Sequence, residues 1–188
     1  MNANTQLRMM VYASLLAALT AAGAYLAIPI GPVPIILQNL FVFLSGLLLG
    51  SRWGFASVAV YLLAGAVGLP VFAGGLGGIG RLAGPTGGYL VGFLPAVWVI
   101  GWISERSKTN IFADVFAMIC GAVITYAFGV TWLKTVTGMT LTKTLAVGVY
   151  PFLFGDAVKI AAAVLIADAL RPVIRVPGSR FRGSNYKQ

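Results

Sequence analysis

Long apolar stretches separated by short connections make up most of this chain, and they limit what it can fold into. The six stretches cover residues 9–28, 35–49, 53–69, 88–103, 111–133 and 146–170. A helix that crosses a membrane needs about 20 consecutive, mostly apolar residues. The second and fourth stretches are shorter, so we expect tilted or incompletely spanning helices there. The pattern predicts an all-α membrane protein, with a bundle of six transmembrane helices in residues 1–172.

The scarcity of charged residues supports this fold class and narrows the function. Only 9% of the 188 residues are charged, whereas a soluble domain carries about 25%, so the chain lacks the polar groups to cover a water-facing surface. Histidine is absent and Cys120 is the single cysteine, which excludes an intrachain disulfide and a His/Cys metal site. A catalytic centre would have to use carboxylates and hydroxyls alone. We therefore predict that the protein is not an enzyme and holds no metal or cofactor.

The basic residues indicate which side of the membrane each connection faces. Lys and Arg number 13 against 4 Asp and Glu. If the N-terminus is cytoplasmic, three basic residues are external: Arg81, Lys134 and Lys143. Nine are then internal, namely Arg8, Arg52, Arg106, Lys108, Arg171, Arg175, Arg180, Arg182 and Lys187, and the thirteenth, Lys159, lies within the sixth stretch. Because cytoplasmic connections are rich in Lys and Arg, we predict cytoplasmic termini and a basic cytoplasmic tail at 173–188. The basic residues form no patch interleaved with exposed aromatic residues, so nucleic acid is not an expected partner.

Two ionisable residues lie near the middle of the sixth apolar stretch. Asp156 and Lys159 are three residues apart, so they share one face of a helix. A charge at the bilayer centre costs about 2.5–3.5 kcal/mol on insertion scales. The pair is either a self-satisfied ion pair that packs the bundle or part of a substrate cavity; we favour the cavity, because intramembrane ionisable residues usually serve function. Asp168 and Arg171, also three apart, are expected to form a structural ion pair near the membrane surface.

The connection at residues 69–89 contains more glycine than a turn requires. Glycine lets backbone groups approach a ligand closely. The connection also carries Arg81, which can hold a carboxylate with two hydrogen bonds, together with Thr86 and Tyr89. We consider two interpretations: a flexible turn whose arginine reaches the membrane surface, or the lid or wall of a binding site on the external face. We favour the second.

Two further features allow both a structural and a functional interpretation. The connection at 28–39 holds three prolines and ends in Gln38 and Asn39, whose amides either satisfy the backbone or reach a ligand at the same external face. The first stretch contains Ala13, Ala17 and Ala21. Small residues four apart let helices approach closely in lipid, either within this chain or at a docking face for another membrane subunit.

Four segments of the chain together resemble one protein family. They are PVPIILQNL (32–40), YLLAGAVGLPVFAGG (61–75), GPTGGYLVGF (84–93) and PFLFGDAVKIAAA (151–163). Their order and spacing resemble those of the biotin-specific S components of energy-coupling factor (ECF) transporters, the BioY family, over residues 8–171. The resemblance implies an S component in a prokaryotic cytoplasmic membrane that captures external biotin. It also implies partners: a transmembrane coupling subunit and two ATPase subunits. An S component or secondary transporter for another small vitamin-like molecule is the alternative.

The resemblance also implies roles for individual residues. Asp156 and Lys159, in the G-D-x-x-K match, are expected to bind the ureido ring of biotin, and Arg81 is a candidate for its carboxylate. Other expected substrate-binding residues are Gln38, Gly84, Thr86, Gly88 and Tyr89. Such families dock their partners through A-x-x-x-A on the first helix, which Ala13, Ala17 and Ala21 match. One departure is visible: where the family commonly reads P-x-T-x-Q-T, this chain has Ile36 and Asn39 at the threonines.

Overall fold

The computed structural model describes residues 3–28, 35–107 and 110–174. Its helices are α1 (Ala3–Tyr25), α2 (Gln38–Ala66), α3 (Ile79–Ala83), α4 (Gly87–Arg106), α5 (Ile111–Thr137), α6 (Leu141–Gly148) and α7 (Tyr150–Leu170). A short antiparallel ribbon of β1 (Ala27–Ile28) and β2 (Ile35–Ile36) pairs Ala27 with Ile36. The predicted helical fold class is confirmed. The predicted tail at 173–188 lies almost wholly outside the described residues, as do the three prolines of the first connection.

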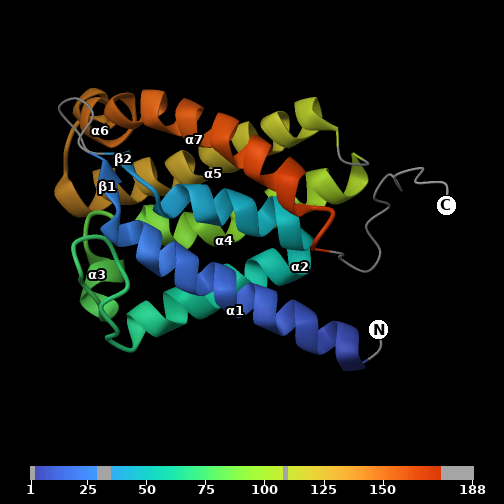
Figure 1. The fold of residues 1–188 in the computed structure, drawn as a ribbon. Coiled ribbons are helices and arrows are strands. Elements are labelled where there is room, and N and C mark those ends of the chain that lie inside the picture. The colour runs from blue at the N-terminus through green and yellow to red at the C-terminus, as the bar shows by residue number, and fades with distance from the viewer. Residues whose placement is uncertain (1–2, 29–34, 108–109, 175–188) are drawn as a thin grey trace, which may run out of the picture.

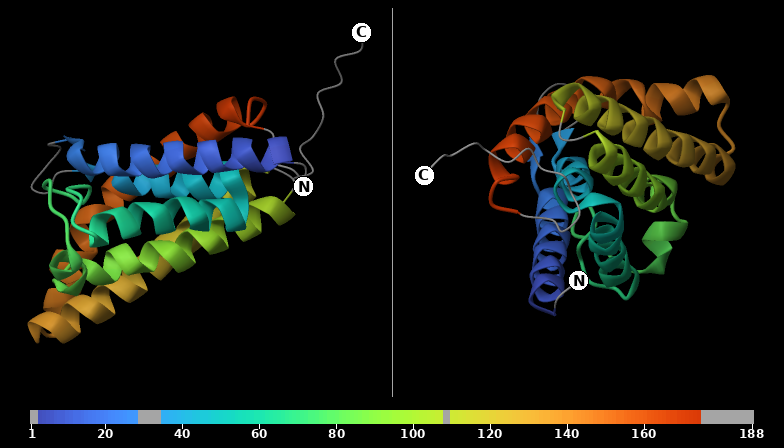
Figure 2. Two further views of the ribbon diagram at one scale, coloured as in Figure 1. Left: turned by 90° about the horizontal axis from the view of Figure 1, so that it is seen from below. Right: turned by 90° about the vertical axis from the view of Figure 1, so that its right-hand side faces the viewer.

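The long helices run side by side along one direction, with the small elements gathered at one end (Figures 1 and 2). Among the residues that the structure describes, five helices are long and apolar enough to cross a membrane: α1, α2, α4, α5, and α6 with α7 taken together as Leu141–Leu170. Helices α6 and α7 are separated by a bend at Val149, whose φ is −130° and ψ −61°. The ribbon, α3 and α6 lie at one end of the bundle. Helix α1 begins and α7 ends at the other (Figure 1).

Helix α2 contains a sharp reversal at Gly50. This residue has φ +76° and ψ −174°, a combination that glycine alone adopts readily. A Cβ at Gly54 would lie 2.7 Å from the carbonyl oxygen of Ser45. These residues would be far apart in a straight helix, so residues 51–66 fold back along residues 38–49, as Figure 1 shows. The second and third apolar stretches of the sequence are therefore two antiparallel halves of one element.

A carboxylate from α4 satisfies the backbone at this reversal. Glu105 accepts hydrogen bonds from the Ser51 amide at 2.9 Å and the Ser51 hydroxyl at 3.0 Å. Because the first amides of a helix have no partner within it, and because negative charge is favoured there, Glu105 caps the second half of α2. A Cβ at Gly101 would lie 2.3 Å from the Ser51 nitrogen. Helix α4 therefore packs directly against the turn.

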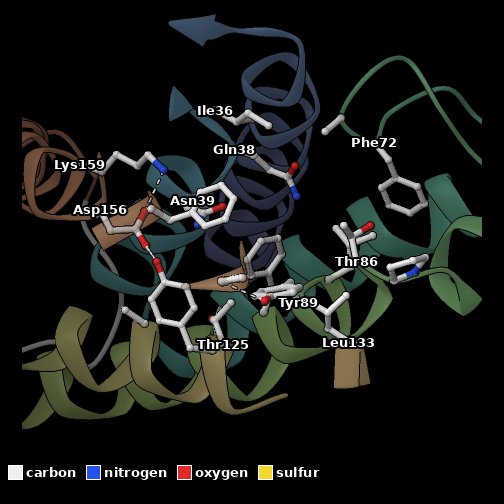
Figure 3. A pocket seen from close by; sticks show the side chains of 18 of the residues that line it. Ile36, Gln38, Asn39, Phe72, Thr86, Tyr89, Thr125, Leu133, Asp156 and Lys159 are labelled. Atoms are coloured by element: carbon white, nitrogen blue, oxygen red, sulfur yellow. Dashed lines mark hydrogen bonds and ion pairs between the residues drawn. The ribbon is translucent and has the colours of Figure 1, made fainter. Parts of the chain in front are cut away.

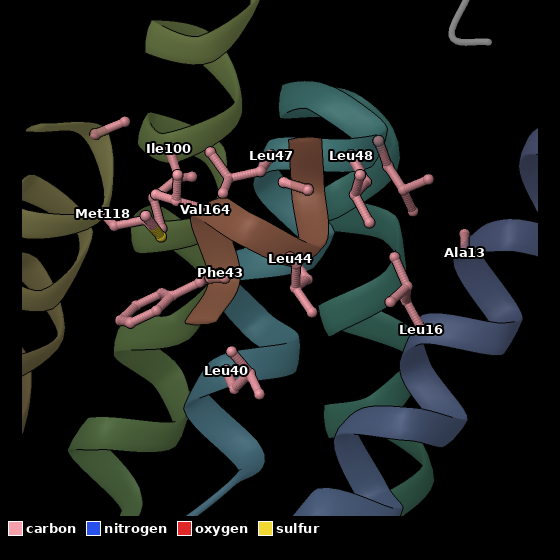
Figure 4. Close-up of a cluster of buried hydrophobic side chains, with 14 of the residues drawn as sticks. Ala13, Leu16, Leu40, Phe43, Leu44, Leu47, Leu48, Ile100, Met118 and Val164 are labelled. Carbon is pink, nitrogen blue, oxygen red and sulfur yellow. The ribbon is translucent and has the colours of Figure 1, made fainter. Parts of the chain in front are cut away.

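The apolar core forms two clusters between the helices. The larger one joins α1, the first half of α2, α4, α5 and α7, and it includes Leu44, Ile100, Met118 and Val164 (Figure 4). The smaller one surrounds Tyr61 and Phe72. Nearly every residue in the first half of α2 is buried. That half is thus the central element against which the other helices pack.

A second polar network lies at the end of the bundle where α7 ends. The Arg171 guanidinium donates to both oxygens of Asp114, at 2.6 and 2.9 Å, and to the Ser104 hydroxyl at 2.9 Å. Arg171 is 7% and Asp114 1% exposed. The expectation that Arg171 pairs with Asp168 is therefore wrong: Asp168 is exposed. The arginine turns instead towards the junction of α4 and α5, because a buried cation needs a buried partner.

The Asp114→Asn substitution should strongly destabilise the protein, because it leaves the Arg171 cation buried without a counter-charge. Removing one partner of a buried ion pair costs about 3–5 kcal/mol. Thermal unfolding of the detergent-purified protein measures the effect. Asp168→Asn is the matched control and should change the unfolding temperature little. Equal effects of the two substitutions would contradict this account.

The Gly50→Ala substitution should also destabilise the fold, because its Cβ would lie 2.0 Å from Glu105 Oε1. Backbone strain of this kind costs about 1–3 kcal/mol for a residue other than glycine, and displacement of the Glu105 cap adds to it. Gly80→Ala is the control, since a Cβ there meets nothing within 4 Å. Unfolding temperatures that fall by the same amount in both variants would show that the reversal does not require glycine.

Candidate functional site

A cavity of about 260 Å³ lies at the end of the bundle that holds the ribbon and α3. Its walls come from β2, the starts of α2 and α4, α5 from its middle onward, α6, the first half of α7 and the connection between α2 and α4. The apolar lining consists of Ile36, Phe43, Phe72, Ala73, Pro85, Leu90, Phe93, Ala122, Leu133, Val147, Gly148 and Phe152. The polar lining consists of Gln38, Asn39, Arg81, Thr86, Tyr89, Thr125, Tyr126, Asp156 and Lys159. A mostly apolar cavity with a few convergent polar groups is typical of a small-molecule site.

Asp156 and Lys159 form a pair of opposite charges in the cavity wall (Figure 3). Lys159 Nζ lies 2.9 Å from Asp156 Oδ1, and each residue is 5% exposed. The hydroxyl of Tyr126 donates to the other oxygen, Oδ2. The ammonium has three donors and the carboxylate about four acceptor positions. Both groups therefore keep unused hydrogen-bonding capacity at the cavity surface.

Tyr89 connects α4 with the bend between α6 and α7. Its hydroxyl donates to the carbonyl of Gly148 at 2.9 Å. Its ring stands edge-on to that of Tyr126, with 6.5 Å between centroids and 88° between planes. A Cβ at Gly129 would lie 2.2 Å from the Tyr89 ring, so the glycine makes room for it. The two tyrosines thus form one continuous aromatic wall.

The connection between α2 and α4 packs closely on the bundle. Phe72 is fully buried, and a Cβ at Gly65 would lie 2.0 Å from its ring. The Phe72 ring meets that of Tyr61 edge-on at 5.6 Å, and the Tyr25 hydroxyl donates to the carbonyl of Pro70. Of the two interpretations of this connection, a flexible turn and a wall, the packing fits the wall.

The structure brings six of the eight predicted substrate-binding residues to the cavity. They are Gln38, Arg81, Thr86, Tyr89, Asp156 and Lys159. Gly84 and Gly88 lie beside it. The Gly84 carbonyl accepts a hydrogen bond from the Trp132 indole at 3.0 Å, and a Cβ at Gly88 would lie 2.2 Å from Trp132 Cβ. These two glycines therefore position the connection and the start of α4 against α5.

Several lining residues could not be selected from the sequence. Tyr126, Thr125 and Phe152 look like ordinary members of apolar stretches. A phenol in the middle of a spanning stretch is a signal, because its hydroxyl needs a partner in lipid. The partner, Asp156, is 30 residues away, and no spacing rule connects the two. Within the described residues, no three His, Cys, Asp or Glu side chains gather that could hold a metal ion.

The alanines predicted to dock a partner mostly face the interior of this chain. Ala13 and Ala17 are 5% and 6% exposed and belong to the two core clusters. Ala21 is partly buried against the smaller cluster. The structure thus shows the packing alternative for Ala13 and Ala17: these small side chains let α1 pack on α2. The docking assignment to those two residues does not fit their burial.

The comparisons with known proteins agree with one another. Residues 1–176 match the sequence profile of the BioY family. The chain is 43% identical over 166 residues to the "Biotin transporter BioY" of Thermotoga maritima, covering 88% of this chain and 96% of that protein. It is 42% identical over 158 residues to the "Probable biotin transporter BioY" of Pyrococcus horikoshii, covering 84% and 93%.

A solved structure gives the same result. A crystal structure of the S component for biotin from an ECF-type ABC transporter matches with a TM-score of 0.83 at 33% identity, over 92% of this chain and 95% of that one. The relatives are named as transporters, in agreement with the prediction that this chain is not an enzyme. The resemblance seen in four sequence segments is confirmed. Because the family profile spans residues 1–176 and both relatives align over most of their own length, this chain belongs to the BioY family.

Proposed function

We propose that this protein is the biotin-binding membrane subunit of an ECF-type importer, an S component that captures external biotin for uptake driven by partner ATPases. The observation that carries the proposal is the buried Asp156–Lys159 pair in the wall of a mostly apolar cavity. The names of the relatives agree with it.

The charged pair complements a cyclic urea. On one edge of such a ring, an N–H donor and the carbonyl acceptor lie side by side. A carboxylate accepts the N–H and an ammonium donates to the carbonyl, and in this chain the two groups are adjacent at 2.9 Å. Charge-assisted hydrogen bonds of this kind are about twice as strong as neutral ones. The ureido ring of biotin therefore fits against Asp156 and Lys159.

The remaining parts of biotin match the rest of the cavity. The thiophane ring and aliphatic chain suit the apolar lining, which includes Phe43, Phe93 and Phe152. Thr86 and Phe72 lie on the side of the pocket away from Asp156 (Figure 3). Arg81, in α3, belongs to the same connection, and it is the residue we assign to the carboxylate, because a guanidinium binds carboxylates with two hydrogen bonds.

We further propose six membrane crossings with both termini in the cytoplasm. The two antiparallel halves of α2 supply the second and third crossings, and α6 with α7 the last. Arg8 lies near the start of α1, Arg106 and Arg171 at the ends of α4 and α7, and Arg52 just after the reversal in α2. Positive residues of this kind are expected on the cytoplasmic side, which is then the side opposite the cavity. In this orientation the cavity faces the outside, where biotin is captured.

The membrane-embedded coupling subunit would meet α1 on its exposed face, and two ATPase subunits would complete the complex. Ser14, Ala18 and Ala22 follow one another at four-residue intervals along α1 and are exposed on the surface of this chain. Small residues at that spacing, serine included, allow close helix contact in lipid. The proposed docking stripe is therefore displaced by one residue from Ala13, Ala17 and Ala21.

The Asp156→Asn substitution should weaken biotin binding about 10- to 100-fold, because a hydrogen bond to a charged group is lost. Calorimetry on the detergent-purified protein measures the affinity. Asp168→Asn, at the other end of α7, is the matched control and should bind biotin like the parent. A folded parent that does not bind biotin would reject the function. Tight binding by the Asp156 variant would place the site elsewhere.

The Arg81→Ala substitution should weaken the binding of biotin about 10-fold, through loss of a charge-assisted contact. It should leave the affinity for biotin amide, which has no carboxylate, nearly unchanged. Arg106→Ala, at the opposite end of the bundle, serves as the control. An equal loss for both ligands would show that Arg81 supports the fold of the connection and does not recognise the carboxylate.

A further inference from the structure

Tyr126 contacts the proposed ureido-binding carboxylate from a different helix. Its hydroxyl, on α5, donates to Oδ2 of Asp156 on α7, while Lys159 donates to Oδ1. Each carboxylate oxygen thus has one partner among the described residues. Lys159 lies one turn further along the same helix as Asp156, so it moves together with it. Within the described residues, Tyr126 is the single hydrogen-bond partner that reaches the Asp156 side chain from another element.

The Asp156 side chain needs such a partner to hold one orientation. The terminal torsion of an aspartate is broad and nearly two-fold, so a carboxylate bound only to Lys159 could rotate about it. A hydrogen bond from α5 to the second oxygen fixes the plane of the carboxylate relative to the cavity. A group fixed before the ligand arrives loses less freedom on binding.

Tyr126 is itself held in place. Its ring meets the Tyr89 ring edge-on, and the Tyr89 hydroxyl is bound to the Gly148 carbonyl. A series of contacts therefore runs across the cavity. It leads from Gly148 at the end of α6 to Tyr89 on α4, then to Tyr126 on α5 and finally to Asp156 on α7. The phenol is positioned by packing on one side and by its hydrogen bond on the other.

We propose that Tyr126 is a positioning residue for recognition of the ureido ring, an inference that rests on the proposed binding of biotin. Its hydroxyl holds the Asp156 carboxylate so that a free acceptor position meets the ligand N–H beside the Lys159 ammonium. Tyr126 acts through Asp156. The benefit of its hydroxyl therefore depends on that carboxylate and on a ligand that can donate to it.

The test compares two Tyr→Phe substitutions in the full-length protein in detergent. Tyr126→Phe should raise the Kd for biotin about 10-fold, the loss expected for a hydrogen bond to a charged group. Tyr61→Phe is the matched control. Tyr61 is 1% exposed, does not line the cavity, and its hydroxyl has no hydrogen-bond partner in the described structure. This control should bind biotin within about twofold of the parent, and unfolding temperatures show that both variants are folded.

Two further measurements separate positioning from general packing. In an Asp156→Asn background, with affinities measured by displacement, Tyr126→Phe should change the Kd less than about twofold, because coupled residues are not additive. A biotin derivative methylated on both ureido nitrogens cannot donate to Asp156, so Tyr126→Phe should leave its affinity unchanged.

Three results would overturn the inference: parent-like biotin binding by Tyr126→Phe, an equal loss in both backgrounds, or an equal loss in Tyr61→Phe. Failure of the proposed function looks different. If the parent does not bind biotin, the ligand assignment fails. If Asp156→Asn binds like the parent, the location of the site fails. In either case the proposed role of Tyr126 is rejected together with that assignment.

Discussion

A polar group in a medium that offers no hydrogen bonds is stabilised when another part of the chain supplies a partner. Three polar centres in the described structure join distant segments in this way. Glu105 of α4 caps the reversal in α2, Arg171 joins the end of α7 to the junction of α4 and α5, and Asp156 joins α7 to α5. Apolar packing holds the helices together, whereas these polar contacts favour one rotation of each helix about its axis and one position along it.

The centres differ in how completely they are satisfied. Glu105 accepts hydrogen bonds from a backbone amide and a hydroxyl. Both oxygens of Asp114 accept from the Arg171 guanidinium. These contacts suit carboxylates with a structural role. The Asp156–Lys159 pair lines a cavity and keeps free donors and acceptors. A buried polar network that remains incomplete costs stability unless a partner completes it. If the cavity binds biotin as we propose, the ligand supplies the partners that this pair lacks within the chain.

Much of this arrangement could be predicted from the sequence. The apolar stretches gave the helices, and the spacing of Asp156 and Lys159 placed both on one face. Glycine content pointed to the connection that forms part of the cavity wall. Contacts between distant segments could not be predicted in the same way. Arg171 lies nearest in sequence to Asp168 but pairs with Asp114, because burial and not spacing decides the partner. Likewise, the sequence shows small residues repeating every four positions in α1 but not which of the two neighbouring stripes faces inward.

The first half of α2, residues 38–49, is about 18 Å long at 1.5 Å per residue, whereas the hydrocarbon core of a bilayer is about 30 Å thick. A straight helix of this length does not reach across the core by itself, so the crossing that we propose for it depends on local thinning of the bilayer. The reversal at Gly50 joins it to residues 51–66. Its cap, Glu105, is made later, at the end of α4. Because the chain is synthesised from its N-terminus, the reversal in α2 gains this cap only after α4 has been made.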